Sequence, residues 1–319
     1  MVFALINHLD AHFDEQETDE KAICNFCYKQ TQFSAILLGM KGLVMEGGAM
    51  RGMFTAGVCD VLLENGINFD GAIGVSAGAT FGCNFKSRQI GRAIRYNKRF
   101  AHDWRYCSFR SLLLTGDLYG ADFCYNELPN KLDLFDYEEY RSNPLKFYAV
   151  ASDCRTGEPV YKELATCDEK DLTWMRASAS MPLVSRVVKI DGYELLDGGM
   201  TDSIPLKAFE GMGYEKNLVI LTQPRSFVKE QSFSIKMMKF TLRKYPKLYE
   251  AMKKRHETYN AQKKYVFEQE TAGKCLVICP FEPLGISRTE KNPDELQRVY
   301  NLGRLTMQES MARLREFLK

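Results

Sequence analysis

The stretch FDGAIGVSAGATFGCNF, residues 69–85, joins a short apolar run to a helical pattern through a serine flanked by glycines. Residues 69–75 predict a buried parallel strand and residues 77–85 predict a helix. Between them, Gly74-Val75-Ser76-Ala77-Gly78 has the G-x-S-x-G pattern that holds a hydroxyl out on a tight strand-to-helix turn. We interpret Ser76 as a nucleophile for acyl transfer, with a helix-capping serine as the alternative.

A second unit of the same kind precedes it. The apolar run 42–45 predicts a strand, residues 52–64 predict a helix, and EGGAMRG, residues 46–52, lies between them. Paired glycines leave backbone amides free to stabilise an oxyanion or a phosphate. The dinucleotide fingerprint is broken at Ala49, and the Gly-Lys-Ser/Thr of a phosphate-binding loop is absent. One unit offering amides and one offering a serine together favour an acyl-transfer site.

Strands and helices alternate through most of the remaining sequence, which predicts an α/β domain with a mainly parallel sheet. The segments that carry this prediction are a helical stretch over 87–105, paired strands at 146–152 and 159–162, a helix over 172–180, a hairpin over 186–196 turning at Asp191-Gly192, strands at 217–222 and 274–279, and an amphipathic helix over 294–318.

The composition is that of a folded protein with a sizeable core. The 319 residues are 45% hydrophobic and 26% charged, and a net charge of +2 argues against a dedicated nucleic-acid binder. No apolar run near the start approaches the roughly 18 residues of a membrane span. The ten cysteines are dispersed, which is typical of reduced thiols. We therefore expect a cytoplasmic protein.

Residues 1–40 form a polar segment, which we expect to be a flexible leader, with translation from Met40 as an alternative. Two histidines and two cysteines in this segment could bind zinc, but their order reverses that of the usual finger. They are His8, His12, Cys24 and Cys27. We expect a catalytic domain over 41–211 and a C-terminal extension over 212–319 that supplies further strands and amphipathic helices.

A catalytic serine needs a base, and two kinds of base are available. His102 and His256, in basic surroundings, are typical of solvated helix residues. Asp197, in Asp197-Gly198-Gly199, follows an apolar strand and begins a glycine turn. Such a turn is common without any catalytic role, so the residues alone leave the base open.

The three motifs, in their order and contexts, resemble those of the patatin-like phospholipases over residues 41–211. These motifs are Gly47-Gly48-Ala49-Met50-Arg51-Gly52, the serine motif at 74–78 and Asp197-Gly198-Gly199; the resemblance also includes residues 177–182. It implies a three-layer α/β/α sandwich, a Ser76–Asp197 dyad without histidine, an oxyanion hole at Gly47 and Gly48 with Arg51 beside them, and no metal or cofactor. The sequence departs from the family pattern at Glu46, where aspartate is usual, and at Ala49, where a third glycine is usual.

Residues 229–264 are strongly basic. Eleven Lys and Arg against three Glu give this segment a net charge of +8, and aromatic and aliphatic residues are interleaved with them. Such a segment can lie on an anionic membrane. The alternative is an ordinary pair of amphipathic helices that covers the active site.

The leading hypothesis is a serine lipid acyl hydrolase, acting as a phospholipase, lysophospholipase or esterase on a lipid or fatty-acyl ester. Three alternatives remain: an acyltransferase with the same dyad, an α/β-hydrolase esterase using Ser76, Asp197 and His256, and a non-catalytic lipid-binding protein.

Overall fold

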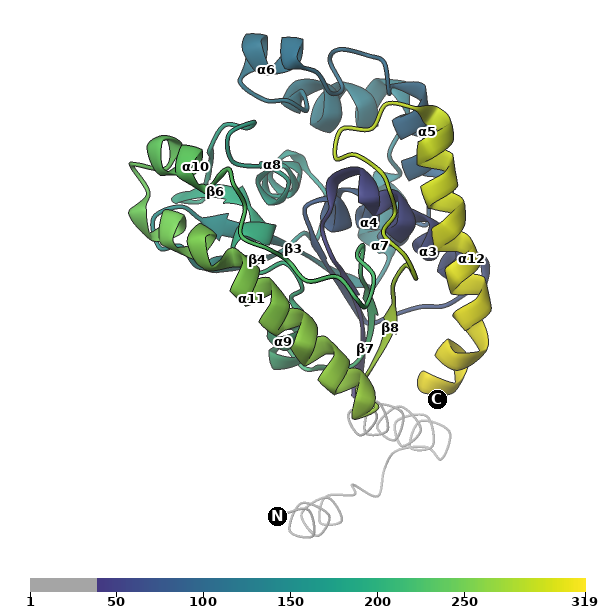
Figure 1. Cartoon of the computed structure of the whole chain (residues 1–319). Helices are drawn as coiled ribbons and strands as arrows, with labels where there is room; N and C mark the ends of the chain where they lie inside the picture. The colour runs from purple at the N-terminus through teal and green to yellow at the C-terminus, as the bar shows by residue number, and fades with distance from the viewer. Residues whose placement is uncertain (1–38) are drawn as a thin grey trace, which may run out of the picture. The chain divides into compact units, whose positions relative to one another are not determined.

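A central sheet with helices on both faces organises the protein, as Figure 1 shows for the computed structural model, which describes residues 39–319. The strand β1 (Met40–Met45) explains the layering, because successive side chains of a strand point to opposite faces. Leu43 and Met45 enter one hydrophobic core, whereas Val44 enters the other. The prediction of a three-layer α/β/α sandwich is therefore confirmed.

The sheet has eight strands in the order β5-β6-β3-β2-β1-β7-β8, with β4 also paired to β3. The pairs β1–β2, β2–β3 and β7–β8 are parallel, whereas β4 and β6 run antiparallel to β3 and β5 runs antiparallel to β6. The remaining strands are β2 (Gly71–Val75), β3 (Lys146–Asp153), β4 (Pro159–Glu163), β5 (Val188–Ile190), β6 (Tyr193–Asp197), β7 (Tyr214–Ile220) and β8 (Cys275–Ile278).

The helices divide between the two faces of the sheet, with α3 and α12 on one side and α9 and α11 on the other (Figure 1). The α-helices are α3 (Gly52–Glu64), α4 (Ala77–Lys86), α5 (Arg92–Arg99), α6 (Phe109–Thr115), α7 (Tyr137–Ser142), α8 (Glu169–Ser178), α9 (Leu206–Gly211), α10 (Ile235–Thr241), α11 (Pro246–Thr271) and α12 (Pro293–Phe317). Two short 3-10 helices, η1 (Ala49–Arg51) and η3 (Gly198–Met200), and a π-helix, η2 (Phe123–Leu132), complete the elements.

The helix α12 packs closely along α3. The backbones meet where Gly57 of α3 faces the Tyr300 carbonyl and Gly303 of α12 faces the Phe54 carbonyl. The Tyr300 hydroxyl also donates a hydrogen bond of 2.6 Å to Asp60. The C-terminal segment thus supplies the last two strands of the order, β7 and β8, and a covering helix.

The prediction of one helical stretch over residues 87–105 is wrong. Gly91 interrupts it with a left-handed φ of 72°, and the helix α5 covers Arg92–Arg99 alone. His102 consequently lies in an exposed turn rather than in a helix. The proposed metal ligands at 8, 12, 24 and 27 lie outside the described residues.

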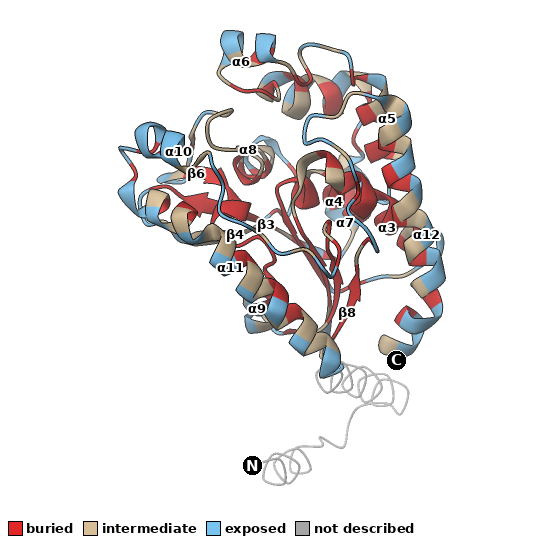
Figure 2. Cartoon of the chain, viewed as in Figure 1, coloured by how far each residue is buried: buried red, intermediate tan, exposed pale blue. Residues whose placement is uncertain are grey.

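The structure also bears on membrane insertion. Within residues 39–319, no helix combines the length and the apolar character that crossing a bilayer requires. Figure 2 shows the central strands of the sheet buried, whereas α6 and α10 carry many exposed residues.

Candidate active site

Ser76 lies at the turn between β2 and α4 in a strained backbone conformation, with φ of 55° and ψ of −118°. Its amide donates a hydrogen bond of 2.9 Å to the hydroxyl oxygen of Ser178, a fully buried residue at the end of α8. Ser178 thereby fixes the backbone of the serine turn from a neighbouring helix.

The two glycines of the serine motif are required because of close backbone approach. A methyl group on Gly74 would overlap the Gly78 carbonyl, and one on Gly78 would overlap the Met45 carbonyl of β1. The G-x-S-x-G pattern therefore reflects the packing of α4 directly over the ends of two strands.

This packing leads to a stability prediction. We expect Gly78→Ala to lower the free energy of unfolding by about 1–3 kcal/mol or more, because the new methyl group overlaps rigid backbone. A matched control is Gly211→Ala, since a methyl group there would meet no atom within 4 Å. Urea unfolding measures both variants, and equal stabilities would contradict the close approach.

Asp197 ends β6 and is held on several sides. Its amide donates to the Ser180 carbonyl at 2.8 Å, its carbonyl accepts from the Ser152 hydroxyl at 2.8 Å, and its Oδ1 accepts from the Gly199 amide at 2.8 Å. Burial raises the pKa of Asp197, while hydrogen bonds from the Ser76 hydroxyl and the Gly199 amide act in the opposite direction. Ser76 and Asp197, 121 positions apart in the sequence, are thus brought close enough for the serine hydroxyl to act on the pKa of the aspartate.

The glycine loop after β1 lies against the serine turn. A methyl group on Gly47 would come 3.0 Å from the Ser76 Cβ, so the two backbones are adjacent. Within residues 39–319, neither the Gly47 nor the Gly48 amide donates a hydrogen bond. Ala49, where the family usually has glycine, adopts a left-handed φ of 50°. These two amides are available to stabilise a negative oxygen beside Ser76.

Glu46 forms a buried connection between three segments. Its Oε1 accepts a hydrogen bond of 2.8 Å from the Tyr259 hydroxyl of α11, and its Oε2 accepts one of 2.6 Å from the Thr222 amide after β7. The Thr222 hydroxyl in turn donates to the Gly47 carbonyl at 3.0 Å. The longer glutamate side chain, in place of the usual aspartate, here reaches α11 while supporting the glycine loop.

Arg51 lies beside the glycine loop. Its Nη2 would be 3.1 Å from a methyl group on Gly48, and its Nε donates to the Thr222 hydroxyl at 3.5 Å. Burial lowers the pKa of Arg51, and the negative charge of Glu46 opposes this.

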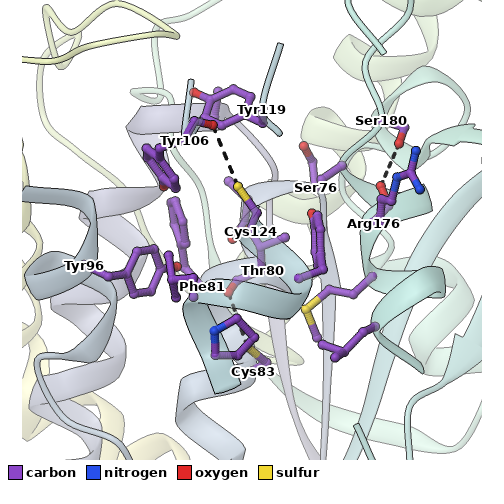
Figure 3. A pocket seen from close by; sticks show the side chains of 18 of the residues that line it. Ser76, Thr80, Phe81, Cys83, Tyr96, Tyr106, Tyr119, Cys124, Arg176 and Ser180 are labelled. Carbon is purple, nitrogen blue, oxygen red and sulfur yellow. Dashed lines mark hydrogen bonds between the residues drawn. The ribbon is translucent and has the colours of Figure 1, made fainter. Parts of the chain in front are cut away.

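A largely apolar pocket opens at Ser76 (Figure 3). Aromatic side chains contribute much of its wall, and they come from α4, α5 and the segment 106–135, a segment for which the sequence carried no specific prediction. The aromatic lining residues are Phe81, Tyr96, Tyr106, Tyr119, Tyr125 and Phe135. The pocket has the chemistry and the position to accommodate a hydrocarbon chain attached to a group reacting at Ser76.

The two histidines of residues 39–319, His102 and His256, form no hydrogen bond with Ser76 or Asp197. His256 is on α11, with its Nε2 3.7 Å from the Glu257 carboxylate. His102 is exposed in its turn. Neither histidine is among the groups that perturb the pKa of Asp197.

Sequence reasoning missed several residues around the site. Ser178 gave a weak signal, because it lies in the 177–182 stretch of the family resemblance. Thr222 and Tyr259 gave none, since their roles depend on where β7 and α11 pass Glu46 in three dimensions.

Comparisons with known proteins identify a family for this chain. Residues 43–210 match the family model of the patatin-like phospholipases, and residues 245–319 match a domain of unknown function. YjjU of Escherichia coli, an uncharacterised protein, is 27% identical over 84% of this chain and 76% of that protein. The lysophospholipase nte1 of Aspergillus oryzae is 27% identical over 54% of this chain, which spans only 11% of that longer protein.

Among solved structures, VipD of Legionella pneumophila aligns with a TM-score of 0.41 and 13% identity, over 85% of this chain and 66% of that one. The family assignment itself depends on the match to the family model, which covers more than half of the chain and includes Ser76 and Asp197. The chain therefore belongs to the patatin-like phospholipase family.

Proposed function

We propose that this protein is a lipid acyl hydrolase in which Ser76 is the nucleophile, Asp197 is the base and the Gly47 and Gly48 amides form the oxyanion hole. The observation that carries the proposal is the approach of the Ser76 hydroxyl to the buried Asp197 carboxyl at the opening of an apolar pocket, beside the Gly47 and Gly48 amides, which donate no hydrogen bond within residues 39–319. Family membership supports hydrolysis of lipid esters in general.

The reaction begins when the Ser76 Oγ attacks the ester carbonyl carbon and its proton passes to the Asp197 carboxylate. The carbonyl oxygen becomes an oxyanion, which the Gly47 and Gly48 amides stabilise. Collapse of this intermediate breaks the bond to the alcohol, which leaves with the proton from Asp197. Water then attacks the carbonyl carbon of the acylated Ser76 while Asp197 takes a water proton. The bond to the Ser76 Oγ breaks, Asp197 returns the proton to this oxygen, and the acid is released.

Burial favours this role for Asp197. A carboxylate is ordinarily a weak base for a serine hydroxyl, and the raised pKa of Asp197 makes it a stronger proton acceptor. The strained Ser76 backbone keeps the hydroxyl in place, so its orientation costs nothing further during the reaction. The acyl chain of the substrate occupies the aromatic-lined pocket of Figure 3.

The direct test is a panel of p-nitrophenyl esters, phospholipids and lysophospholipids, incubated with wild-type protein and Ser76→Ala. Serine-dependent release of acid from at least one lipid ester is the expected result. A panel with no serine-dependent turnover would contradict the proposal.

We further propose that this enzyme is cytoplasmic and contacts membranes peripherally through the basic segment 229–264. The helix α10 and the residues just before it expose large apolar side chains beside lysines, which is the pattern of a surface-binding helix. These side chains are Phe233 (102% exposed), Phe240 (72%) and Met237 (60%), with Lys236 and Lys239 between them.

Membrane contact leads to a prediction for vesicle binding. We expect binding to increase with anionic lipid and to weaken with salt, because exposed charges are screened beyond about 10 Å at 0.1 M. Phe240→Ser should weaken sedimentation with anionic vesicles, whereas Leu305→Ser, at an exposed leucine of α12, should not. Equal binding to neutral and anionic vesicles would contradict membrane contact and would favour the alternative that α10 and α11 only cover the active site.

A further inference from the structure

Four basic side chains gather near the glycine loop and the proposed dyad. They are Arg51 after the glycine loop, Lys229 in the segment between β7 and α10, Arg255 on α11 and Arg288 between β8 and α12. None of these four side chains lines the aromatic pocket. We call these four residues the cationic cluster.

Arg51 and Arg255 flank the reacting groups directly. The Arg51 guanidinium lies against Gly48, whose amide belongs to the proposed oxyanion hole. The Arg255 Nε donates to the Gly199 carbonyl, and its Nη2 would be 3.3 Å from a methyl group on Gly199. The Gly199 amide donates a hydrogen bond to Asp197. The Arg255 guanidinium therefore contacts the same glycine residue that holds the proposed base.

Lys229 is placed by α11. Its amide donates to the Asn260 side chain at 2.9 Å, and its Nζ lies 4.4 Å from the centre of the Tyr259 ring. The hydroxyl of that ring binds Glu46, so the ammonium group sits over the same connection that supports the glycine loop.

Arg288 completes the cluster from the C-terminal region. Its carbonyl accepts a hydrogen bond of 3.0 Å from Tyr119, which fixes the loop that carries it. Its charge acts on Asp197 and on each of the other three members of the cluster.

The charges in this region do not balance. In the described part of the chain, no member of the cluster forms an ion pair with a carboxylate. Two carboxylates, Glu46 and Asp197, act on the cluster, so four positive charges face two negative ones. Both Glu46 oxygens already accept hydrogen bonds from neutral donors. Arg51, Lys229 and Arg255 are partly buried, whereas Arg288 is exposed. An unneutralised excess of positive charge among partly buried side chains is costly unless an anion binds there.

An ester bound at Ser76 extends in two directions from its carbonyl carbon. With the acyl chain in the aromatic pocket, the alcohol part must point away from that pocket. We propose that the cationic cluster binds a terminal phosphate on the alcohol part, and that the preferred substrates are acyl esters of phosphorylated alcohols. This proposal rests on the proposed function. A phosphate monoester carries nearly two negative charges at neutral pH, which matches the excess.

Arg255 and Arg288 both lie within residues 245–319, the region that matches a domain of unknown function. A phosphate site at the cationic cluster would therefore be formed in part by this region. Their position makes this region a determinant of substrate choice rather than a covering layer alone.

Lys229 makes the predicted preference dependent on pH. Burial, together with repulsion from Arg255, Arg51 and Arg288, lowers the pKa of Lys229 to about 8, although Glu46 opposes this. The lysine is charged below that pH and loses its charge as the pH rises through it. Preference for a phosphorylated substrate should therefore be strong near pH 7 and decline above pH 8, and the decline should be absent in Lys229→Arg.

The test compares two substrates with one acyl chain, 1-oleoylglycerol 3-phosphate and 1-oleoylglycerol, in the full-length protein. We expect the phosphorylated ester to have the higher kcat/KM, and Lys229→Gln or Arg288→Gln to reduce the ratio of the two values about tenfold, as for loss of a charged hydrogen bond. Lys229→Arg should restore the ratio. Lys207→Gln, which removes an exposed charge on α9, should leave it unchanged.

A binding measurement separates this proposal from the proposed function. Calorimetric titration of Ser76→Ala with 1-oleoylglycerol 3-phosphate, glycerol 3-phosphate and inorganic phosphate reports on the cluster without turnover. Lipid binding that is weakened in Ser76→Ala/Lys229→Gln supports a headgroup site, whereas equally tight binding of inorganic phosphate would indicate a free-phosphate site and overturn the substrate proposal. Serine-dependent hydrolysis of both esters with equal kcat/KM would reject the headgroup site and leave the hydrolase intact. No hydrolysis of any ester would reject the hydrolase itself.

Discussion

Replacing Ser76 with alanine is expected to abolish covalent labelling by a fluorophosphonate probe and to reduce kcat for a short-chain ester by roughly 10⁴- to 10⁶-fold, as in other serine hydrolases that lose their nucleophile. The reason is that the hydroxyl at the strained turn forms the covalent bond, and no backbone group can replace it. In-gel fluorescence and steady-state kinetics measure the two effects.

The control for this experiment is Ser142→Ala, which removes an exposed hydroxyl at the end of α7 and should label and turn over like wild type. Persistent labelling of Ser76→Ala would mean that another serine is the nucleophile.

Replacing Asp197 with asparagine should be nearly as damaging, with a loss in kcat/KM of roughly 10³-fold or more, because the amide cannot accept the Ser76 proton. His256→Asn and His102→Asn should each retain most of the activity, since neither side chain is in contact with the dyad. The measurement is kcat/KM for one ester across these variants at fixed pH. A loss of similar size in His256→Asn would favour a Ser-Asp-His triad instead.

The pH profile provides a check on the same residue. Asp197 acts as a base in its ionised form, and burial raises its pKa. Activity should therefore be present above this pKa and be lost as the pH falls through it, at a higher pH than an ordinary aspartate would give. Asp202→Asn removes a second buried carboxylate that binds Tyr161 and Gln262 rather than Ser76, and it should leave the acid limb in place.

The parts of the fold set by local patterns could be predicted from the sequence. The helix expected over 52–64 is α3 to the residue, and the hairpin expected about Asp191-Gly192 is formed by β5 and β6. Buried strands and glycine turns leave strong local signals because each depends on its own residues and their immediate neighbours. For the same reason, Ser76 could be proposed as a nucleophile from its own motif, whereas Asp197 could be proposed as the base only through the family resemblance.

The residues that could not be predicted depend on contacts between distant segments. Arg255 appears in the sequence as one of several basic residues of a helix, and only the course of α11 past Gly199 brings it to the dyad. The segment between α5 and β3 gave no periodic signal, partly because η2 is a π-helix containing Pro129 and does not repeat every 3.6 residues. Its aromatic side chains nevertheless form much of the pocket.

The close contact between α12 and α3 has a consequence for modularity. The regions that match the two family models, 43–210 and 245–319, are not separated by a domain boundary in the three-dimensional structure. A chain ending at residue 244 would lack β8 beside β7 and would expose the face of α3 that Tyr300 and Gly303 cover. We therefore expect that the two regions can be exchanged between relatives only together. Exchange of one region alone would have to reproduce the contact between the α3 and α12 backbones, which leaves no room for a side chain at Gly57 or Gly303.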